Sequence, residues 1–144
     1  MKKSFVLAAV LCFCLFLCAE KTASAYVLDE KHPIDVEMER MLDENSSTAG
    51  VIEAYEYASK EWDKLLNENY RALMQRLTKE EQDKLRASQR EWIKFRDLEF
   101  AFNAEYWSKF MGTMYRPFPL AFQCDFVRER ALRLGFYLED LDMR

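Results

Sequence analysis

The stretch from residue 51 to residue 111 contains neither glycine nor proline, and this constrains the fold more than any other feature of the chain. These two residues are the usual interruptions of helices, so a stretch this long without either favours long helices. Its apolar residues recur every three or four positions, which places them on one face of an α-helix. No alternating pattern typical of strands is found. The sequence therefore predicts an all-α fold.

Local signals divide this stretch into two helices. Cap candidates at residues 45–48 precede a first helix over residues 52–77, and the stripe from Trp62 to Tyr70 is expected in the core. Thr78-Lys79-Glu80-Glu81 is a capping box that begins a second helix at once, ending near Gly112. Because the turn is short, we expect these two helices to pack against each other as an antiparallel hairpin.

A third helix is predicted from a regular apolar seam between Leu120 and Leu141, which includes Cys124. A connector over residues 111–119 precedes it. The expected architecture is a small antiparallel bundle of three long helices, with room for a short N-terminal helix around residues 36–42.

The N-terminus has the pattern of an export signal. Lys2 and Lys3 precede an apolar run, and Ala23-Ser24-Ala25 is a cleavage site of small residues. The run is too short for an ordinary membrane span. A lipoprotein signal at Cys18 is the rival, but Leu17 is larger than the residue that normally precedes a lipidated cysteine. We expect a signal peptide over residues 1–25, a polar leader over 26–45 and a helical domain over 46–144.

Composition excludes several classes of function. The net charge is −4, and removal of a signal with net charge +2 leaves about −6, which suits a basic protein partner and not nucleic acid. The only histidine, His32, lies in the leader, and no metal-ligand spacing or phosphate-binding glycine loop is present. We therefore expect no enzyme, no metal and no cofactor.

The cleaved chain keeps Cys124 as its only cysteine, so an internal disulfide is impossible. Two interpretations of Cys124 stay open, a buried inert thiol and a disulfide between two chains.

The second helix carries charges beside large apolar residues. Trp92 and Phe95 are expected to face inward, and buried charges are costly unless they are paired. One interpretation joins Arg96, Asp97 and Glu99 to Arg128 or Arg130 of the third helix. The other assigns Arg90, Arg96 and Glu99 to a partner protein.

The connector is the best candidate for a binding patch. It is rich in methionine and aromatic residues, which is unusual for a solvated loop. The alternative is that these side chains cap the open end of the bundle. The candidate binding residues are Met111, Met114, Tyr115, Arg116 and Phe118.

Several motifs resemble those of the lysozyme-inhibitor LprI-like family of small exported bacterial helical domains. The resemblance covers roughly residues 41–140. It is carried on the first helix by Leu66, Asn67 and Tyr70, on the second by Gln89, Arg90, Trp92, Ile93, Phe95, Arg96, Asp97 and Glu99, and on the third by Arg130 and Leu134.

The resemblance implies a periplasmic or cell-envelope protein whose partner is a basic lysozyme-type hydrolase. Blockage of the glycan cleft by the connector is the expected means, with Tyr115 and Arg116 as inserting side chains. The alternative is a non-inhibitory envelope protein that docks another exported protein. Many relatives resemble a framework with disulfides at the positions of Met41 with Ala54 and of Phe100 with Cys124, of which only Cys124 is a cysteine here.

Overall fold

The computed structural model describes residues 31–143, and all regular structure within that range is helical. The helices from Pro33 onward form one compact unit. They are α2 (Pro33–Glu44), α3 (Thr48–Arg76), α4 (Lys79–Ser108), the short 3-10 helix η1 (Thr113–Tyr115) and α5 (Pro117–Asp142). The all-α prediction is confirmed for this part of the chain. The expected signal peptide and its cleavage site lie outside the described residues.

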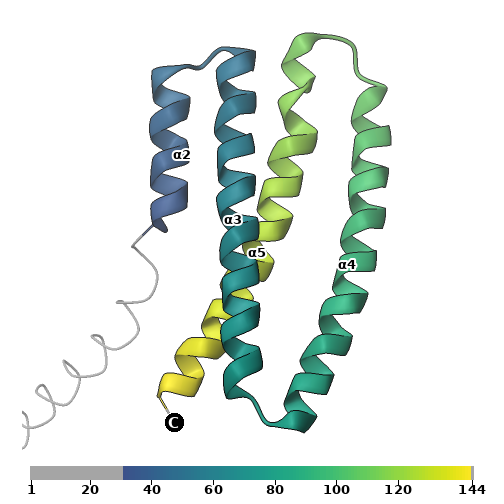
Figure 1. Cartoon of the computed structure of the whole chain (residues 1–144). Helices are drawn as coiled ribbons and strands as arrows, with labels where there is room; N and C mark the ends of the chain where they lie inside the picture. Colours follow the sequence, from purple (N-terminus) through teal and green to yellow (C-terminus); the bar gives the residue numbers. More distant parts are fainter. Residues whose placement is uncertain (1–30, 144) are drawn as a thin grey trace, which may run out of the picture. The chain divides into compact units, whose positions relative to one another are not determined.

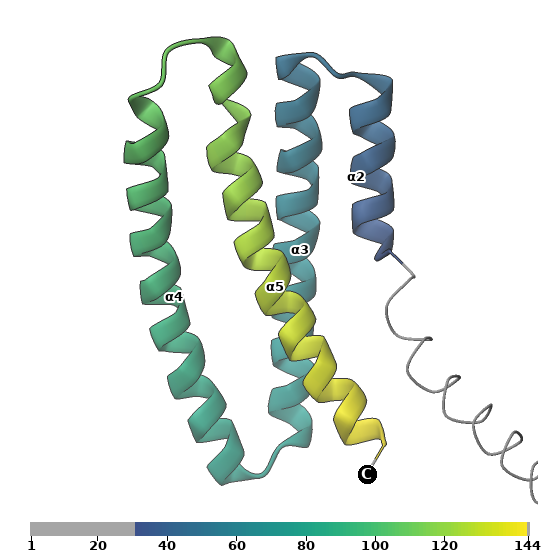
Figure 2. The ribbon, with the colours of Figure 1, turned by 180° about the vertical axis from the view of Figure 1, so that it is seen from behind.

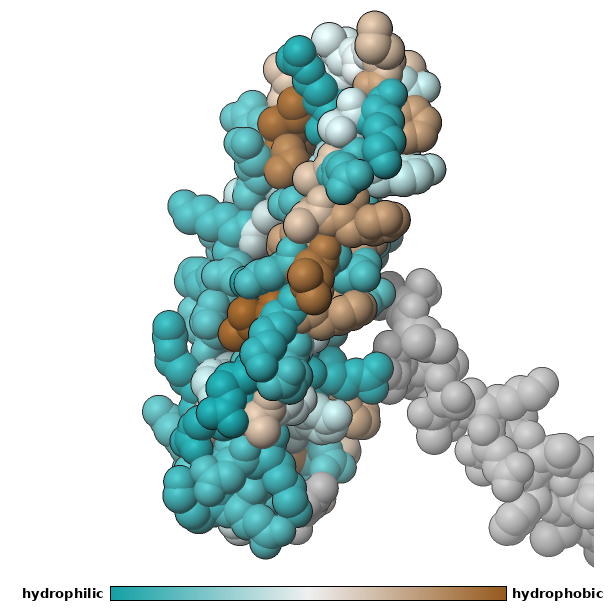
Figure 3. Space-filling view, turned by 90° about the vertical axis from the view of Figure 1, so that its right-hand side faces the viewer, coloured by the Kyte–Doolittle hydropathy of each residue, from teal (hydrophilic) through white to brown (hydrophobic). Residues whose placement is uncertain are grey.

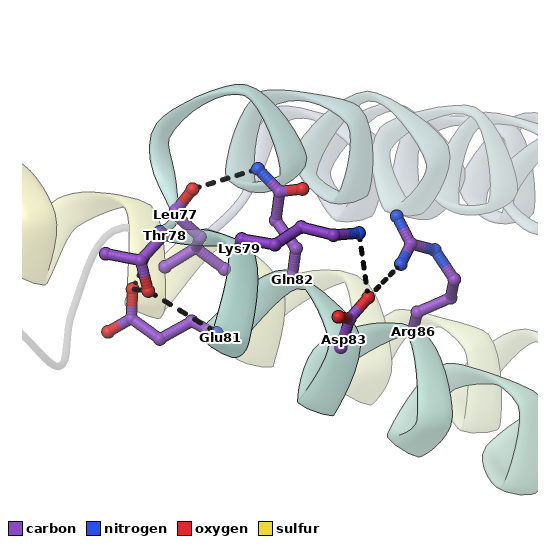
Figure 4. A network of polar contacts seen from close by, with 7 residues as sticks. All are labelled: Leu77, Thr78, Lys79, Glu81, Gln82, Asp83 and Arg86. Carbon is purple, nitrogen blue, oxygen red and sulfur yellow. Dashed lines mark hydrogen bonds and ion pairs between the residues drawn. The ribbon is translucent and has the colours of Figure 1, made fainter.

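Local capping explains where the long helices begin. Ser47 caps α3, and its side chain accepts a hydrogen bond from the backbone N–H of Gly50 at 3.2 Å. A β-carbon at Gly50 would lie 2.2 Å from the backbone oxygen of Asn45, so only glycine fits this turn. The predicted capping box is present at α4, where Glu81 accepts from the backbone N–H of Thr78 at 2.9 Å (Figure 4).

The helices lie side by side in an order that differs from their order along the chain. Figures 1 and 2 show α2 beside α3, α3 beside α5, and α5 beside α4. The expected hairpin of the first two long helices is therefore wrong in its packing. The chain does reverse at Thr78, but α4 packs on α5, because α5 occupies the flank of α3 that a hairpin partner would cover.

The core lies between α3 and α5, as their apolar seams predict. The buried residues of the core cluster come from these two helices alone: Ala58, Trp62, Leu66, Leu73, Cys124, Val127, Ala131 and Leu134. At Gly135 the helices approach closely, since a β-carbon there would lie 3.2 Å from the side-chain nitrogen of Asn69. That nitrogen donates to the carbonyl oxygen of Ala131 at 3.0 Å, which fixes the two helices in register.

The helix α2 replaces most of the expected polar leader. It is longer than the predicted 36–42 segment, and Asp35 in its first turn is buried. The Asp35 carboxylate accepts from Nη2 of Arg128 on α5 at 2.8 Å and from Nε at 3.1 and 3.0 Å. This ion pair joins α2 to α5 beside the middle of α3, where the guanidinium of Arg128 lies 5.4 Å from the centroid of the Trp62 ring.

The orientation of α4 is the main departure from expectation. Its two buried residues are polar, Gln89 and Asn103, and its inward face also carries Trp92, Arg96 and Phe100. Phe95 was expected to face inward with Trp92, but it is exposed, as are Phe102 and Tyr106 further along the same helix. Figure 3 views the molecule from the side on which α4 lies, and apolar side chains reach the surface in its middle and upper parts.

Candidate functional site

The chain between α4 and α5 is a short turn over residues 109–116 that contains the 3-10 helix η1. The helix α4 ends at Ser108, earlier than the predicted Gly112, and α5 already begins at Pro117. Gly112 has φ of +112°, a left-handed conformation that side chains disfavour, so this position requires glycine. Pro117 is suited to the first turn of a helix, where its missing N–H costs nothing. The turn therefore has a fixed geometry.

Aromatic rings anchor the connector to the end of α4. The ring of Trp107 lies 4.5 Å from that of Phe118, 5.1 Å from that of Phe110 and 6.3 Å from that of Tyr115, measured between centroids. Phe110 and Tyr115 are also in contact, at 5.2 Å. Pairs of this kind contribute about 0.5–1.5 kcal/mol each beyond the burial of their area. Sequence reasoning missed Trp107 and Phe110, although their position directly before the connector was a usable signal.

The remaining connector side chains project from this anchor into solvent. Met111 is 92% exposed and Met114 is 64% exposed, and Arg116 is exposed between them and α5. A hollow of about 470 Å³ on one side includes Trp107 and Arg116 in its lining. On the other side a hollow of about 320 Å³ is lined by Met114, Phe118 and residues at the start of α3.

The connector divides into a capping part and an exposed part, and its role in binding stays a prediction. Tyr115 is half-buried in the aromatic cluster and caps the end of α4, while the two methionines and Arg116 are presented to solvent. The five candidate residues are brought together in space, and they divide into an anchoring pair, Tyr115 and Phe118, and a projecting set.

The second-helix motif joins α4 to α5. The buried side-chain oxygen of Gln89 accepts from Nε of Arg130 at 3.0 Å. The guanidinium groups of Arg96 and Arg130 lie 5.4 and 5.7 Å from the centroid of the Trp92 ring. Cation–π contacts of this kind are attractive. Burial lowers the pKa of Arg130.

The expected ion-pair network between the second and third helices is not the one observed. Arg96 pairs with Asp97 on its own helix at 2.7 Å, and Arg128 pairs with Asp35 of α2. In the described part of the chain Glu99 makes no ion pair with α5. The reason is that α2, which the sequence only weakly indicated, supplies the carboxylate for Arg128. Arg90 is exposed.

The first-helix motif has a structural place. Leu66 is buried in the core, and Tyr70 packs against it. The side-chain amide nitrogen of Asn67 donates to the backbone oxygen of Asp63 at 2.7 Å and to the Asp63 carboxylate at 3.0 Å, both within α3. These residues lie on α3, away from the connector.

Cys124 is a free, buried thiol on α5. Its burial raises the pKa of the thiol, which keeps the unreactive protonated form at neutral pH. This agrees with the interpretation of an inert thiol. Among residues 31–143 no group of three or more histidine, cysteine, aspartate or glutamate side chains is arranged to hold a metal ion.

The fold and the connector define a small all-α domain with an anchored, exposed turn at one end. The family described as "Lysozyme inhibitor LprI" matches residues 42–134, and the chain belongs to this family. A solved structure of an uncharacterised protein from Burkholderia thailandensis is similar, with a TM-score of 0.73 and 28% sequence identity over 79% of this chain. The similarity spans 57% of that protein, so this chain accounts for little more than half of its length. No curated protein matches the chain.

Proposed function

We propose that this protein is an exported cell-envelope binding protein that inhibits a lysozyme-type hydrolase through the connector. The family is described by inhibition and not by a catalytic activity, which agrees with a non-enzymatic role. The observation that carries the proposal is the exposure of Met111 and Met114 on a turn whose aromatic anchor holds it in place. A turn that is already ordered loses little conformational entropy when it enters a cleft.

The division of the connector into anchoring and projecting residues refines which side chains are proposed to contact the hydrolase. Met111, Met114 and Arg116 project and are proposed to enter the hydrolase cleft. Tyr115, the other expected inserting residue, is instead proposed to hold the turn, because its ring packs on Phe110. Flexible methionines fit varied apolar surfaces, and an exposed arginine suits the acidic groups of a glycan-cleaving cleft.

The charge of the protein supports a basic partner. The whole chain carries −4, and the expected cleavage after Ala25 would make the exported form more acidic. Opposite net charges accelerate association, and salt weakens this effect. Export itself is proposed from the N-terminal sequence. Within the described residues no helix has the length and apolar character that a membrane crossing requires.

A lysozyme activity assay tests the proposal. The purified protein is expected to inhibit lysozyme at micromolar concentration and low salt, and the inhibition is expected to weaken as salt is added. No inhibition under these conditions would refute the proposal.

A matched pair of methionine variants tests the site. Met114→Ser is expected to weaken inhibition by about tenfold, the loss of one well-packed apolar contact. Met143→Ser is the control, because Met143 is also exposed but follows the far end of α5. Equal effects of the two variants would exclude the connector.

The alternative function is docking of another exported protein without inhibition. The same exposed turn supports it. Capture of a partner from envelope extract that Met114→Ser abolishes, together with no effect on lysozyme, would favour this alternative.

A further inference from the structure

The outer face of α4 carries an apolar stripe that no element of the described chain covers. Its members are 54%, 71%, 65% and 45% exposed: Phe95, Leu98, Phe102 and Tyr106. Their spacing of three and four residues places them in one line along the helix. Contiguous exposed apolar surface of this kind usually marks an interaction site. The stripe lies on the edge helix of the layer (Figure 1), where a further helix has access to it.

Three of the four stripe residues make ring contacts within the protein. The ring of Phe95 packs on Phe126 of α5 at 5.6 Å, and Phe102 contacts Tyr106 at 6.3 Å. These rings make contacts within the protein, yet each leaves 45% or more of its surface exposed. Little backbone movement is needed when two such helical faces meet.

Charges at the two ends of the stripe indicate what covers it. At the start of the stripe Glu91 pairs with Lys94 at 2.9 Å, and at its other end Glu105 pairs with Lys109 at 3.4 Å. Each end thus carries one carboxylate and one amine in the same order along the chain. Such an arrangement complements itself when two copies run in opposite directions.

We propose that α4 pairs with α4 of a second copy of this chain, in antiparallel orientation about a two-fold axis. With Leu98 of one copy opposite Phe102 of the other, Glu91 falls opposite Lys109. In the same register Lys94 falls within one residue of Glu105, about 1.5 Å along the axis. A two-fold interface makes each of these contacts twice, and the charges fix the register of the apolar stripe.

One contact opposes the pairing. Glu99 lies near the proposed axis and approaches its own copy, and like charges that face each other destabilise a helix pair. We therefore expect an affinity in the micromolar range, weaker than that of an obligate dimer.

Sedimentation equilibrium of the purified protein tests the dimer. The wild type is expected to dimerise below about 100 µM, in the range of modest interfaces. Leu98→Glu is expected to raise the dissociation constant by about 100-fold, because it would bury two unpaired carboxylates. Met143→Glu, on an exposed apolar residue outside α4, is the control and is expected to leave the dimer unchanged. A monomeric wild type at 100 µM, or a dimer insensitive to Leu98→Glu, would overturn the proposal.

A pair of charge variants tests the antiparallel register without touching the apolar stripe. Lys94→Glu with Lys109→Glu makes the ends wholly acidic, and Glu91→Lys with Glu105→Lys makes them wholly basic. Each variant alone is expected to be monomeric, and an equimolar mixture is expected to form a heterodimer. Failure of the mixture to associate would exclude this pairing. If the wild type is a monomer and Leu98→Glu abolishes its inhibition of lysozyme, the stripe would instead be a binding surface for the hydrolase.

Discussion

Replacement of Asp35 by alanine tests how α2 is attached to the rest of the protein. Three hydrogen bonds, of 2.8 to 3.1 Å, join the Asp35 carboxylate to the guanidinium of Arg128. The same guanidinium lies 5.4 Å from the centroid of the Trp62 ring. Bonding to Asp35 raises the pKa of Arg128, so the charged form is further favoured in the folded state. Loss of Asp35 leaves this charge without its carboxylate.

The exposure of the two partners sets the size of the effect. The side chain of Asp35 is 12% exposed and that of Arg128 is 34% exposed. Breaking a fully buried pair costs about 3–5 kcal/mol, whereas an exposed pair contributes about 0.2–1 kcal/mol. For this intermediate pair we expect Asp35→Ala to lower the free energy of unfolding by about 2 kcal/mol.

Urea denaturation followed by circular dichroism measures this loss. With a typical dependence on urea for a small domain, the unfolding midpoint is expected to fall by about 1 M. A double-mutant cycle with Arg128→Met isolates the pair from the separate contact between Arg128 and Trp62. We expect a coupling energy of about 1–2 kcal/mol and faster hydrogen exchange in α2.

The reasoning fails if the coupling energy is near zero. That result would mean that solvent screens the pair as it screens exposed salt bridges, and that apolar contacts alone hold α2 on α3. Asp43→Ala, on the exposed side of α2, is the matched control and is expected to change stability little.

Three further predictions concern turns and the buried thiol. Gly50→Ala is expected to lower the free energy of unfolding by about 2 kcal/mol, because the new β-carbon meets the backbone of Asn45; an unchanged melting temperature would contradict this. Thr78→Ala removes the capping box and is expected to cost about 1 kcal/mol in urea denaturation, which Thr78→Ser restores. Burial raises the pKa of the Cys124 thiol above its usual 9.0. The protonated thiol therefore makes its full contribution to the stability of the folded state below that pH, and this contribution is lost as pH rises through the folded-state pKa. Cys124→Ala is expected to flatten this alkaline decline, leaving the part due to Tyr55, whose pKa burial also raises.

The positions of the long helices were predictable because their signals are local. The apolar repeat located α3 and α5, and the capping box placed the start of α4 at Thr78. The middle of the predicted seam of α5 is buried at Cys124, Val127, Ala131 and Leu134, while Leu120, Leu138 and Leu141 towards its ends are half-buried. A helix that packs against the core with one continuous stripe leaves little ambiguity about which face is inside.

The orientation of α4 was not predictable in the same way. This helix carries two neighbouring stripes of side chains. One runs through Phe95 and Phe102, and the other runs through Gln89 and Arg96. Aromatic residues occur along both stripes. The more apolar stripe was expected inside, but the structure buries Gln89 and exposes Phe95. Gln89 is acceptable inside because Arg130, 41 positions away in the chain, satisfies its oxygen.

The sequence by itself determined that this chain is helical, where its long helices lie, which motifs mark its family and that its connector is rich in methionine and aromatic residues. The tertiary structure decided which helices are neighbours, which face of α4 meets solvent and which carboxylate pairs with Arg128. The physical reason is the range of the interactions. Helix periodicity and caps act within a few residues, whereas Asp35 and Arg128 are 93 positions apart and meet only when α2 and α5 have packed around α3.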